Sequence, residues 1–543
     1  MKKTKGFLAL CAALTVLLAG CGDSGTSNSS SVAPSSGESS TGSVQPSGES
    51  SSETVSEYPE SLRIWAGSFA GQYSAIGAKD YNVNASLQKI CENTGTELIW
   101  EYGSSGNDWM TNFNLMLSSG DYPDIIVYDW KSIPGGAAQY AKEGVIIDLT
   151  DLYQSNLSNV YHALENVDSV NNVKTADGRM YYVPEIFDRP GGGIYQGFVI
   201  RQDMLDEMNE PIPTTLDEYH ALLKKAKEKY GDGFYPMTGV GFNNVLGIGS
   251  LLWAYGITYD FYLEGEKVCY GPLSDRFADG MEYIHTLYAE GLIDPDYATQ
   301  DRAAEKGKIM SDQSMVTFEY QPSGMMEAMA EQNPDFKLVG IPDLKETPDA
   351  PSYTFNQTYL NNIQSFCSYA ISTNCKEPEK AANFINYIFS EEGAQIANWG
   401  EEGVDFEYGP DNKPQFTKEY LMMDDSGKVS RVFGTVSAFA SLRILDAYQA
   451  ILPEVSVQAI ETWVEKDDTS RILPAVSLTE DEQDKITDLL ADLNTYMGER
   501  YSGLVNGQIA LDTIPTIQQE LKDKMHIEEI IEVYQAAYDR FVG

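Results

Sequence analysis

Large aromatic side chains stand next to polar ones at several points where predicted strands or helices end. Aromatic rings offer flat apolar faces, and planar carboxylate, amide and guanidinium groups can hydrogen-bond the hydroxyl rim of a pyranose ring. Such a set indicates non-covalent recognition of a carbohydrate. The candidate residues are Trp65, Trp130, Trp253, Tyr320 and Trp399 among the aromatic ones, and Asp129, Arg201, Asn243, Glu319, Gln357 and Glu402 among the polar ones.

Packing in the core is the alternative role for each of these aromatic residues. Trp253 lies within the apolar run 251–255, which favours the core. Trp130 and Trp399 adjoin polar loop residues and are better ligand candidates.

Catalysis must be weighed because the chain has 81 Asp and Glu residues. A glycosidase needs two carboxyl groups on either side of the scissile bond, one with a raised pKa. With so many acidic residues, a count of carboxylate pairs decides nothing. The sequence contains no glycosidase motif, G-x-S-x-G elbow, H-E-x-x-H motif or phosphate-binding P-loop. We therefore expect a binding protein, not an enzyme, with no cofactor.

Metal binding also has weak support. The chain has only four His and no C-x-x-C pair, which argues against zinc. Asp294, Asp296, Asp467 and Asp468 could join a calcium site, but the spacing of an EF-hand is missing, so we expect surface turns. No metal is predicted. The sequence leaves open whether Cys367 and Cys375 pair or, like Cys91 and Cys269, stay free thiols.

The formal net charge of −44 excludes classes of partner. Nucleic acid and anionic lipid headgroups both require clustered Lys and Arg. Acidity of this kind keeps an outward-facing protein soluble. The ligand is thus expected to be neutral or, as a weaker alternative, cationic.

Predicted strands and helices alternate along the part of the chain that carries the first ligand-binding candidates, from Trp65 to Trp130. The patterns predict strands over 61–65, 97–102 and 124–128, separated by helices over 84–94 and 109–118. This order predicts a doubly wound α/β lobe, in which ligands collect beyond the carboxyl ends of the strands. Residues expected at that edge are Trp65, Ser68, Phe69, Asp129 and Trp130.

A second lobe begins with a predicted strand over 197–201 and a helix over 202–208. Thr215 is a good N-cap for the next helix, over 216–229, with Glu218 as its capping-box partner. The glycines at 191–193 suit a hinge before this lobe, because glycine absorbs the dihedral changes of closure.

The N-terminus resembles a bacterial lipoprotein signal. A basic start, an apolar run over 7–18 too short to span a bilayer, and the sequence LAGC ending in Cys21 predict a signal over 1–20 and lipidation of Cys21. Residues 21–57 are rich in Ser and Gly and predict a flexible tether. A cleaved signal with an incidental cysteine is the alternative.

Four blocks resemble one family and follow one another along the chain in the order found in that family. They are DGRMYYVPE at 177–185, FVIRQDMLDEMNEPIPTTLDEYHALLKKAKEK at 198–229, LYAEGLIDPDYAT at 287–299, and AISTNCKEPEKAANFINYIFSEEGAQIANWGEEGVDFEY at 370–408. They are similar to bacterial extracellular solute-binding proteins of the family 1 type, and the last block to the larger LipO-like members. The resemblance implies a type II periplasmic-binding fold with a hinge and a ligand cleft between two lobes. We expect the first lobe at 58–194 and 366–435 and the second at 195–365 and 436–543.

By this resemblance we expect a monomeric receptor on the outer face of a Gram-positive cell membrane. It would be anchored through Cys21, capture a carbohydrate, most readily an oligosaccharide, and deliver it to an ABC permease. Two alternatives stay open: a glycan-binding surface or sensor protein without transport, and a peptide or polyamine receptor of the same fold.

Overall fold

The computed structural model describes residues 56–66, 80–103, 109–167, 169–189, 191–244, 246–360, 362–432, 434, 440–465 and 468–543. Cys21, Ser68, Phe69 and Asp467 lie outside these ranges, as do the expected signal and nearly all of the expected tether. Among the described residues, no helix combines the length and apolar character needed to cross a membrane.

A six-stranded sheet forms the centre of the first lobe, in the order β13-β4-β10-β3-β1-β2. Strands β1, β2 and β3 run parallel, as the alternating pattern predicts, and β10 runs antiparallel to β3 and β4. The strands are β1 (Ser61–Ala66), β2 (Glu97–Tyr102), β3 (Ile125–Tyr128), β4 (Val183–Phe187), β10 (Ile363–Ile371) and β13 (Leu442–Arg443). Because β13 pairs with β4, this sheet extends past residue 435, the boundary expected from the sequence.

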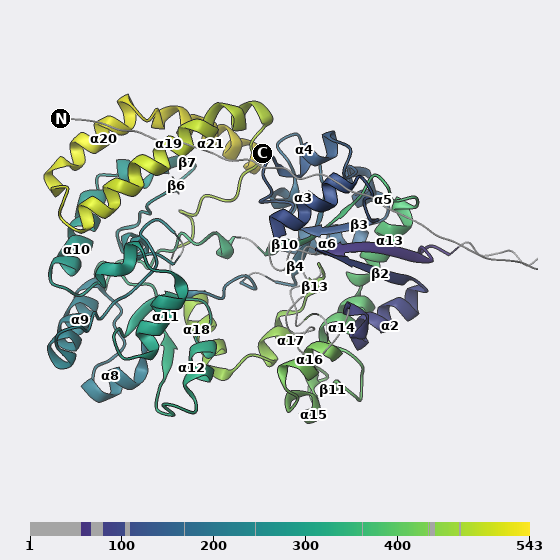
Figure 1. The fold of residues 1–543 in the computed structure, drawn as a ribbon, viewed down its shortest axis with the longest axis horizontal. Coiled ribbons are helices and arrows are strands. Elements are labelled where there is room, and N and C mark those ends of the chain that lie inside the picture. Colours follow the sequence, from purple (N-terminus) through teal and green to yellow (C-terminus); the bar gives the residue numbers. More distant parts are fainter. Residues whose placement is uncertain are drawn as a thin grey trace, which may run out of the picture. The chain divides into compact units, whose positions relative to one another are not determined.

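Local signals explain the first helices. Helix α2 begins after Asn84, whose side-chain oxygen accepts a hydrogen bond from the Leu87 N–H, and ends at Gly95 with a φ of 69°. The helices around the first sheet are α2 (Ala85–Thr94), α3 (Trp109–Ser119), α4 (Gly136–Lys142), α5 (Thr150–Ser155), α6 (Ser158–Asn166), α7 (Val170–Val173), α13 (Pro378–Ile388) and α14 (Glu391–Trp399). Figure 1 shows them in purple, blue and green around the strands.

The second lobe contains a three-stranded sheet in the order β8-β5-β9, with β5 antiparallel to both neighbours. Its strands are β5 (Gly197–Arg201), β8 (Val316–Glu319) and β9 (Leu338–Gly340). In each lobe the antiparallel strand, β10 or β5, is the first strand that the chain forms after arriving from the other lobe.

Helix α18 (Glu454–Val464) packs against β5 and β9. The buried Trp463 donates its indole N–H to the Phe198 carbonyl, and a Cβ at Gly197 would lie only 2.4 Å from that nitrogen. This close approach explains why β5 begins with glycine.

The predicted capping box of the second lobe is confirmed. The Thr215 hydroxyl accepts from the Glu218 N–H, and the Glu218 side chain accepts from the Thr215 N–H. Helices of this lobe are α8 (Gln202–Met208), α9 (Leu216–Tyr230), α10 (Phe277–Ala289), α11 (Arg302–Met310), α12 (Ser323–Met329), α19 (Glu480–Val505), α20 (Ile514–Asp523) and α21 (Ile527–Val542). Helices α19, α20 and α21, in yellow, lie beside the hairpin of β6 (Phe261–Glu264) and β7 (Lys267–Tyr270) (Figure 1).

Each sheet has its own apolar core. The first core draws buried residues from 62–186 and 363–440, and the second from 198–344 and 486–533. The chain therefore passes between the two cores three times. A smaller cluster around Trp399 joins the hairpin of β11 (Phe406–Tyr408) and β12 (Pro414–Phe416) with α15 (Lys418–Leu421), α16 (Asp425–Arg431) and α17 (Leu445–Ala450).

Candidate ligand-binding site

A hollow of about 420 Å³ lies at the carboxyl end of β3, and we call it the first-lobe hollow. Strand β3 ends at Tyr128, so Asp129 is the first residue beyond the sheet. Ligands of open α/β sheets gather at this edge. The lining residues are Trp109, Met110, Tyr128, Asp129, Ser132, Ile133 and Pro134.

Two aromatic rings shape the wall of this hollow. The ring centroids of Trp109 and Tyr128 lie 6.0 Å apart with an interplanar angle of 53°. Phe113, which is fully buried on α3, stacks on Tyr128 at 4.4 Å and holds that ring in place. Trp109 is partly exposed, so part of its surface is open to a ligand.

Two charged residues follow the aromatic wall. The Asp129 carboxylate accepts a hydrogen bond from the Ser132 N–H at 3.1 Å. The Lys131 ammonium donates to the Asn172 carbonyl at 3.3 Å, and burial lowers the pKa of Lys131 to about 8 against the opposing effect of Asp129. The hollow thus offers ring faces together with an anionic acceptor, and the ammonium group of Lys131 lies in its neighbourhood.

Asp129 is the predicted residue that the structure places in this hollow. Trp65 is buried, with its ring centroid 6.0 Å from that of Phe113. Trp130 is fully buried, and its indole N–H donates to the Ile126 carbonyl at 3.0 Å. Both tryptophans therefore pack in the core, and we do not carry them forward as ligand contacts.

The second-lobe candidates separate into buried and exposed residues. Arg201 is 2% exposed and forms ion pairs with Asp203 and Asp312, so it ties elements of the lobe together. Glu319 is equally buried and ion-paired with Arg302. Neither side chain has surface to offer a ligand.

Tyr320, directly after β8, is 39% exposed. Its ring stacks on Tyr195 at 5.7 Å with an interplanar angle of 23°, and the Arg302 guanidinium lies 5.4 Å from its centroid. We call these three residues the Tyr320 platform. In this platform Tyr195 packs against the Tyr320 ring, and part of the Tyr320 ring stays open to a ligand.

The other candidates are dispersed. Trp253 and Trp399 are buried in apolar clusters, as core packing requires. Gln357 donates to the Leu473 carbonyl at 3.0 Å, and Glu402 is exposed beside the β11 strand. Neither lies in the first-lobe hollow.

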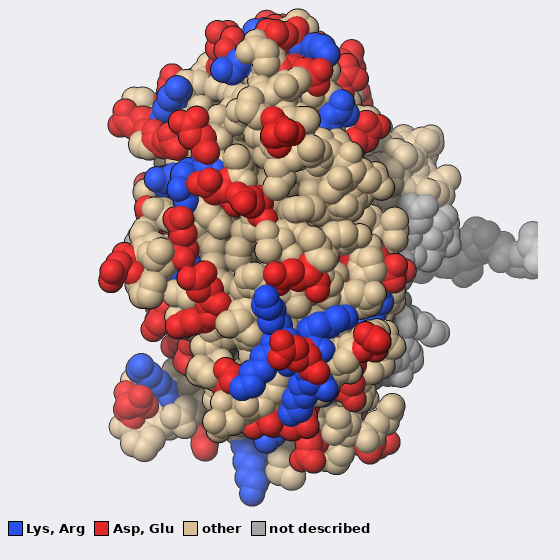
Figure 2. All heavy atoms as spheres, turned by 90° about the vertical axis from the view of Figure 1, so that its left-hand side faces the viewer, with Lys and Arg blue, Asp and Glu red and all other residues tan. Residues whose placement is uncertain are grey.

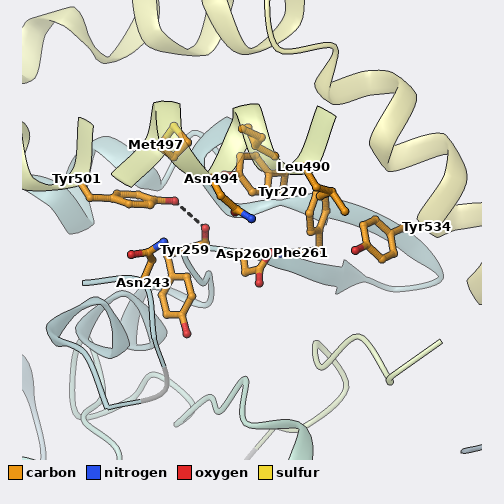
Figure 3. Close-up of a pocket in the computed structure, with 11 residues that line it drawn as sticks. Asn243, Tyr259, Asp260, Phe261, Tyr270, Leu490, Asn494, Met497, Tyr501 and Tyr534 are labelled. Atoms are coloured by element: carbon orange, nitrogen blue, oxygen red, sulfur yellow. Dashed lines mark hydrogen bonds between the residues drawn. The ribbon is translucent and has the colours of Figure 1, made fainter. Parts of the chain in front are cut away.

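A second hollow, of about 180 Å³, lies between the β6–β7 hairpin and helices α19 and α21, and we call it the second-lobe hollow. Figure 3 shows its labelled side chains gathered between these elements. The Tyr501 hydroxyl donates to the Tyr259 carbonyl at 2.6 Å and ties α19 to the segment before β6. The lining residues are Asn243, Tyr259, Asp260, Phe261, Tyr270, Leu490, Leu493, Asn494, Met497, Tyr501 and Tyr534.

Of these lining residues, Asn243 is predicted from the sequence. Trp109 in the first-lobe hollow is not among the residues predicted from the sequence. Trp109 is the first residue of α3, where a ring can point beyond the helix. The place of Trp109 at the start of a helix is the sequence feature that could identify it as a candidate ligand contact. No local signal joins Tyr259 and Asp260 to Asn494 and Tyr534, which lie far away along the chain.

The calcium candidates have other partners. Lys308 donates to Asp294 at 2.7 Å and to Asp296 at 2.8 Å, so an ammonium group already joins these carboxylates. Within the described ranges, no group of three or more His, Cys, Asp or Glu is placed to hold a metal ion. Among the described cysteines, Cys367 and Cys375 do not form a disulfide with each other, and neither do Cys91 and Cys269.

The surface charge matches the acidic composition. Figure 2 shows one face on which Asp and Glu are spread widely and Lys and Arg are interleaved with them. A continuous basic surface of the kind that binds nucleic acid is not seen on that face.

Curated relatives cover most of the chain. It is 25% identical over 499 residues to the fructooligosaccharide ABC transporter substrate-binding protein FusA of Streptococcus pneumoniae serotype 4 (strain ATCC BAA-334 / TIGR4), covering 86% of this chain and 89% of that protein. It is also 25% identical over 338 residues to lipoprotein LipO of Bacillus subtilis (strain 168), covering 59% of this chain and 64% of that protein.

Solved structures share the fold. FusA of S. pneumoniae in complex with kestose superposes with a TM-score of 0.66 at 22% identity, covering 89% of this chain and 99% of that chain. The alginate-binding protein AlgQ2 without calcium ion gives 0.65 at 22% identity, covering 89% of this chain and 98% of that chain. The expected type II periplasmic-binding fold is thereby confirmed.

The family model for bacterial extracellular solute-binding proteins matches residues 71–395, which is more than half of the chain. This family and the relatives above consist of binding proteins and not enzymes. The chain belongs to the bacterial extracellular solute-binding protein family.

Proposed function

We propose that this protein captures an oligosaccharide outside the cell and delivers it to an ABC permease. The observation that carries the proposal is the first-lobe hollow, where the rings of Trp109 and Tyr128 stand beside the Asp129 carboxylate at the ligand edge of the sheet. Relatives support it: FusA is named for fructooligosaccharide transport, and AlgQ2 for alginate binding.

The chemistry of the hollow suits a sugar ring. The apolar C–H face of a pyranose or furanose ring stacks on Trp109, and its hydroxyl groups donate to Asp129. Because Lys131 lies beside Asp129, the carboxylate does not require a cationic ligand. A neutral sugar is therefore the better match for this hollow.

The Tyr320 platform gives the second lobe an exposed ring of its own. We propose that a ligand with several sugar units engages both lobes, one unit at the first-lobe hollow and another at the Tyr320 platform. Contacts with both lobes would stabilise a closed form, because a ligand shifts an equilibrium by its differential affinity for the two states. A chain of sugars fits this arrangement better than a single ring.

Delivery requires the protein to stay near its permease. We propose that the thiol of Cys21 is acylated and that residues 22–57 tether the folded protein to the outer face of the cell membrane. Replacement of Cys21 by Ala should release the protein into the culture medium and abolish incorporation of labelled palmitate. Retention of the label by Cys21→Ala would contradict this part of the proposal.

Calorimetric titration of residues 56–543 against a panel of oligosaccharides tests the central proposal. We expect saturable binding of at least one neutral oligosaccharide, lost in Trp109→Ala and restored in part by Trp109→Phe. Tyr408→Ala is the matched control, because Tyr408 is exposed on β11 and lines neither hollow. Binding of peptides but of no glycan would overturn the proposal.

A further inference from the structure

The second-lobe hollow places the carboxylate of Asp260 among several aromatic rings. Asp260 precedes β6, and Figure 3 shows it below Asn494 of α19. Phe261 lies with its ring centroid 4.9 Å from that of Tyr270 and 4.7 Å from that of Tyr534. These rings, with Tyr259 and Tyr501, surround the approach to the carboxylate.

Asp260 lacks the partner that other acidic residues have. The Phe261 N–H donates to its carboxylate at 2.8 Å. Across the described part of the chain, no Lys, Arg or His lies within ion-pair distance of Asp260. The buried Asp294 is paired with Lys308 and the buried Asp405 with Arg431, whereas Asp260 is an exposed residue.

The missing charge has a physical consequence. Asp260 is an exposed residue, yet the protein atoms packed around its carboxyl group desolvate it and raise its pKa, and the hydrogen bond from Phe261 only partly opposes this effect. Burial raises the pKa of the phenols of Tyr259, Tyr270, Tyr501 and Tyr534, and the nearby Asp260 carboxylate adds to this effect. The surrounding groups thus bring no positive charge to the hollow.

We propose that the second-lobe hollow binds the ammonium group of a small organic cation. The Asp260 carboxylate would supply the opposite charge, and the faces of Phe261, Tyr270 and Tyr534 would contact the cation through their π electrons. The amides of Asn243 and Asn494 would accept hydrogen bonds from its remaining polar groups.

The same chemistry has two sources. An amino sugar carries a primary ammonium group on its ring, and choline carries a quaternary ammonium group on a short chain. A hollow of about 180 Å³ admits a small molecule and excludes a long chain. The inference is independent of the carbohydrate proposal, because the two hollows have no lining residue in common.

The experiment compares charged probes with neutral counterparts on residues 56–543. Glucosamine is titrated against glucose, and choline against its neutral carbon analogue, by calorimetry and thermal shift. We expect at least one cation to bind at least about tenfold more tightly than its neutral counterpart. Binding of glucosamine alone indicates an amino sugar as the ligand, and binding of choline indicates a quaternary ammonium ion.

Asp260→Asn tests the site without removing the acceptor for the Phe261 N–H, since the amide oxygen can replace the carboxylate oxygen. This variant should bind the cation at least about tenfold more weakly. Asp512→Asn is the matched control, because Asp512 is exposed in the loop before α20 and does not line the hollow. Equal binding of charged and neutral probes, or an unchanged cation affinity in Asp260→Asn, would overturn the proposal.

Discussion

The two hollows are both lined by aromatic rings, yet their carboxylates are balanced differently. In the first-lobe hollow, Lys131 lies close enough to Asp129 for the carboxylate to oppose the lowering of its pKa, although no ion pair joins the two among the described residues. In the second-lobe hollow, the described residues place the Phe261 N–H as the donor to the Asp260 carboxylate and no Lys or Arg within ion-pair distance. Aromatic rings alone therefore do not define the ligand, and the charge next to them separates a site for a neutral sugar from a site for a cation.

The largest expected difference between the hollows comes from Trp109. Trp109→Ala should weaken oligosaccharide binding by about 2 kcal/mol, about thirtyfold, because it removes a stacking surface. Cation binding in the second-lobe hollow should stay unchanged. Calorimetry of both ligands on one preparation measures both effects, and an equal loss of both would show that the variant damages the fold.

A smaller loss is expected when the acceptor of the first-lobe hollow is neutralised. Asp129→Asn should weaken sugar binding by about 1.4 kcal/mol, about tenfold, because a charged acceptor becomes a neutral one. The Ser132 N–H keeps an acceptor in the amide oxygen. If affinity for the sugar rises in this variant, Asp129 does not accept from the ligand.

Glu305 provides a third carboxylate for comparison, fully buried but ion-paired with Arg302. Burial raises its pKa from 4.5 to about 7, while Thr317 and Arg302 oppose the shift. The folded state thus binds this proton more tightly, so the stability that it contributes is complete below pH 4.5 and is lost as the pH rises through about 7.

The variant Glu305→Gln should not show this pH-dependent loss of stability, because Gln does not titrate. Between pH 4.5 and 7 the free energy of unfolding should fall by about 2.5 kcal/mol less than in the wild type. Urea unfolding at the two pH values measures the difference. Identical pH profiles for variant and wild type would show that Glu305 does not titrate in this range.

Salt gives the smallest effect. Raising the ionic strength from roughly 0.1 M to roughly 1 M should weaken cation binding at Asp260 by about threefold, because screening reduces the attraction between the charges. Sugar binding in the first-lobe hollow should change little. A cation affinity that salt leaves unchanged would argue that the aromatic rings, and not Asp260, hold the ligand.

Much of the fold could be predicted from the sequence because its signals are local. The N-cap of Asn84, the capping box of Thr215 and Glu218 and the apolar strand before Asp129 each depend on a few neighbouring residues. The residues that line the first-lobe hollow lie between 109 and 134, so local sequence patterns could predict Asp129.

The direction of a side chain and the packing of distant segments could not be predicted from the sequence. Trp130 adjoins polar residues along the chain, yet its ring turns into the core and its N–H bonds to the Ile126 carbonyl. The second-lobe hollow joins residues 243–270 with residues 490–534, and no local pattern connects these segments. Whether Asp260 has a cationic partner is decided only by that packing.

A crystal structure of this protein with the oligosaccharide that binds most tightly tests the carbohydrate proposal most directly. We predict one sugar ring stacked on Trp109, with a hydroxyl group of that ring donating to Asp129. A ligand bound elsewhere in the molecule, with the first-lobe hollow holding no sugar, would contradict it.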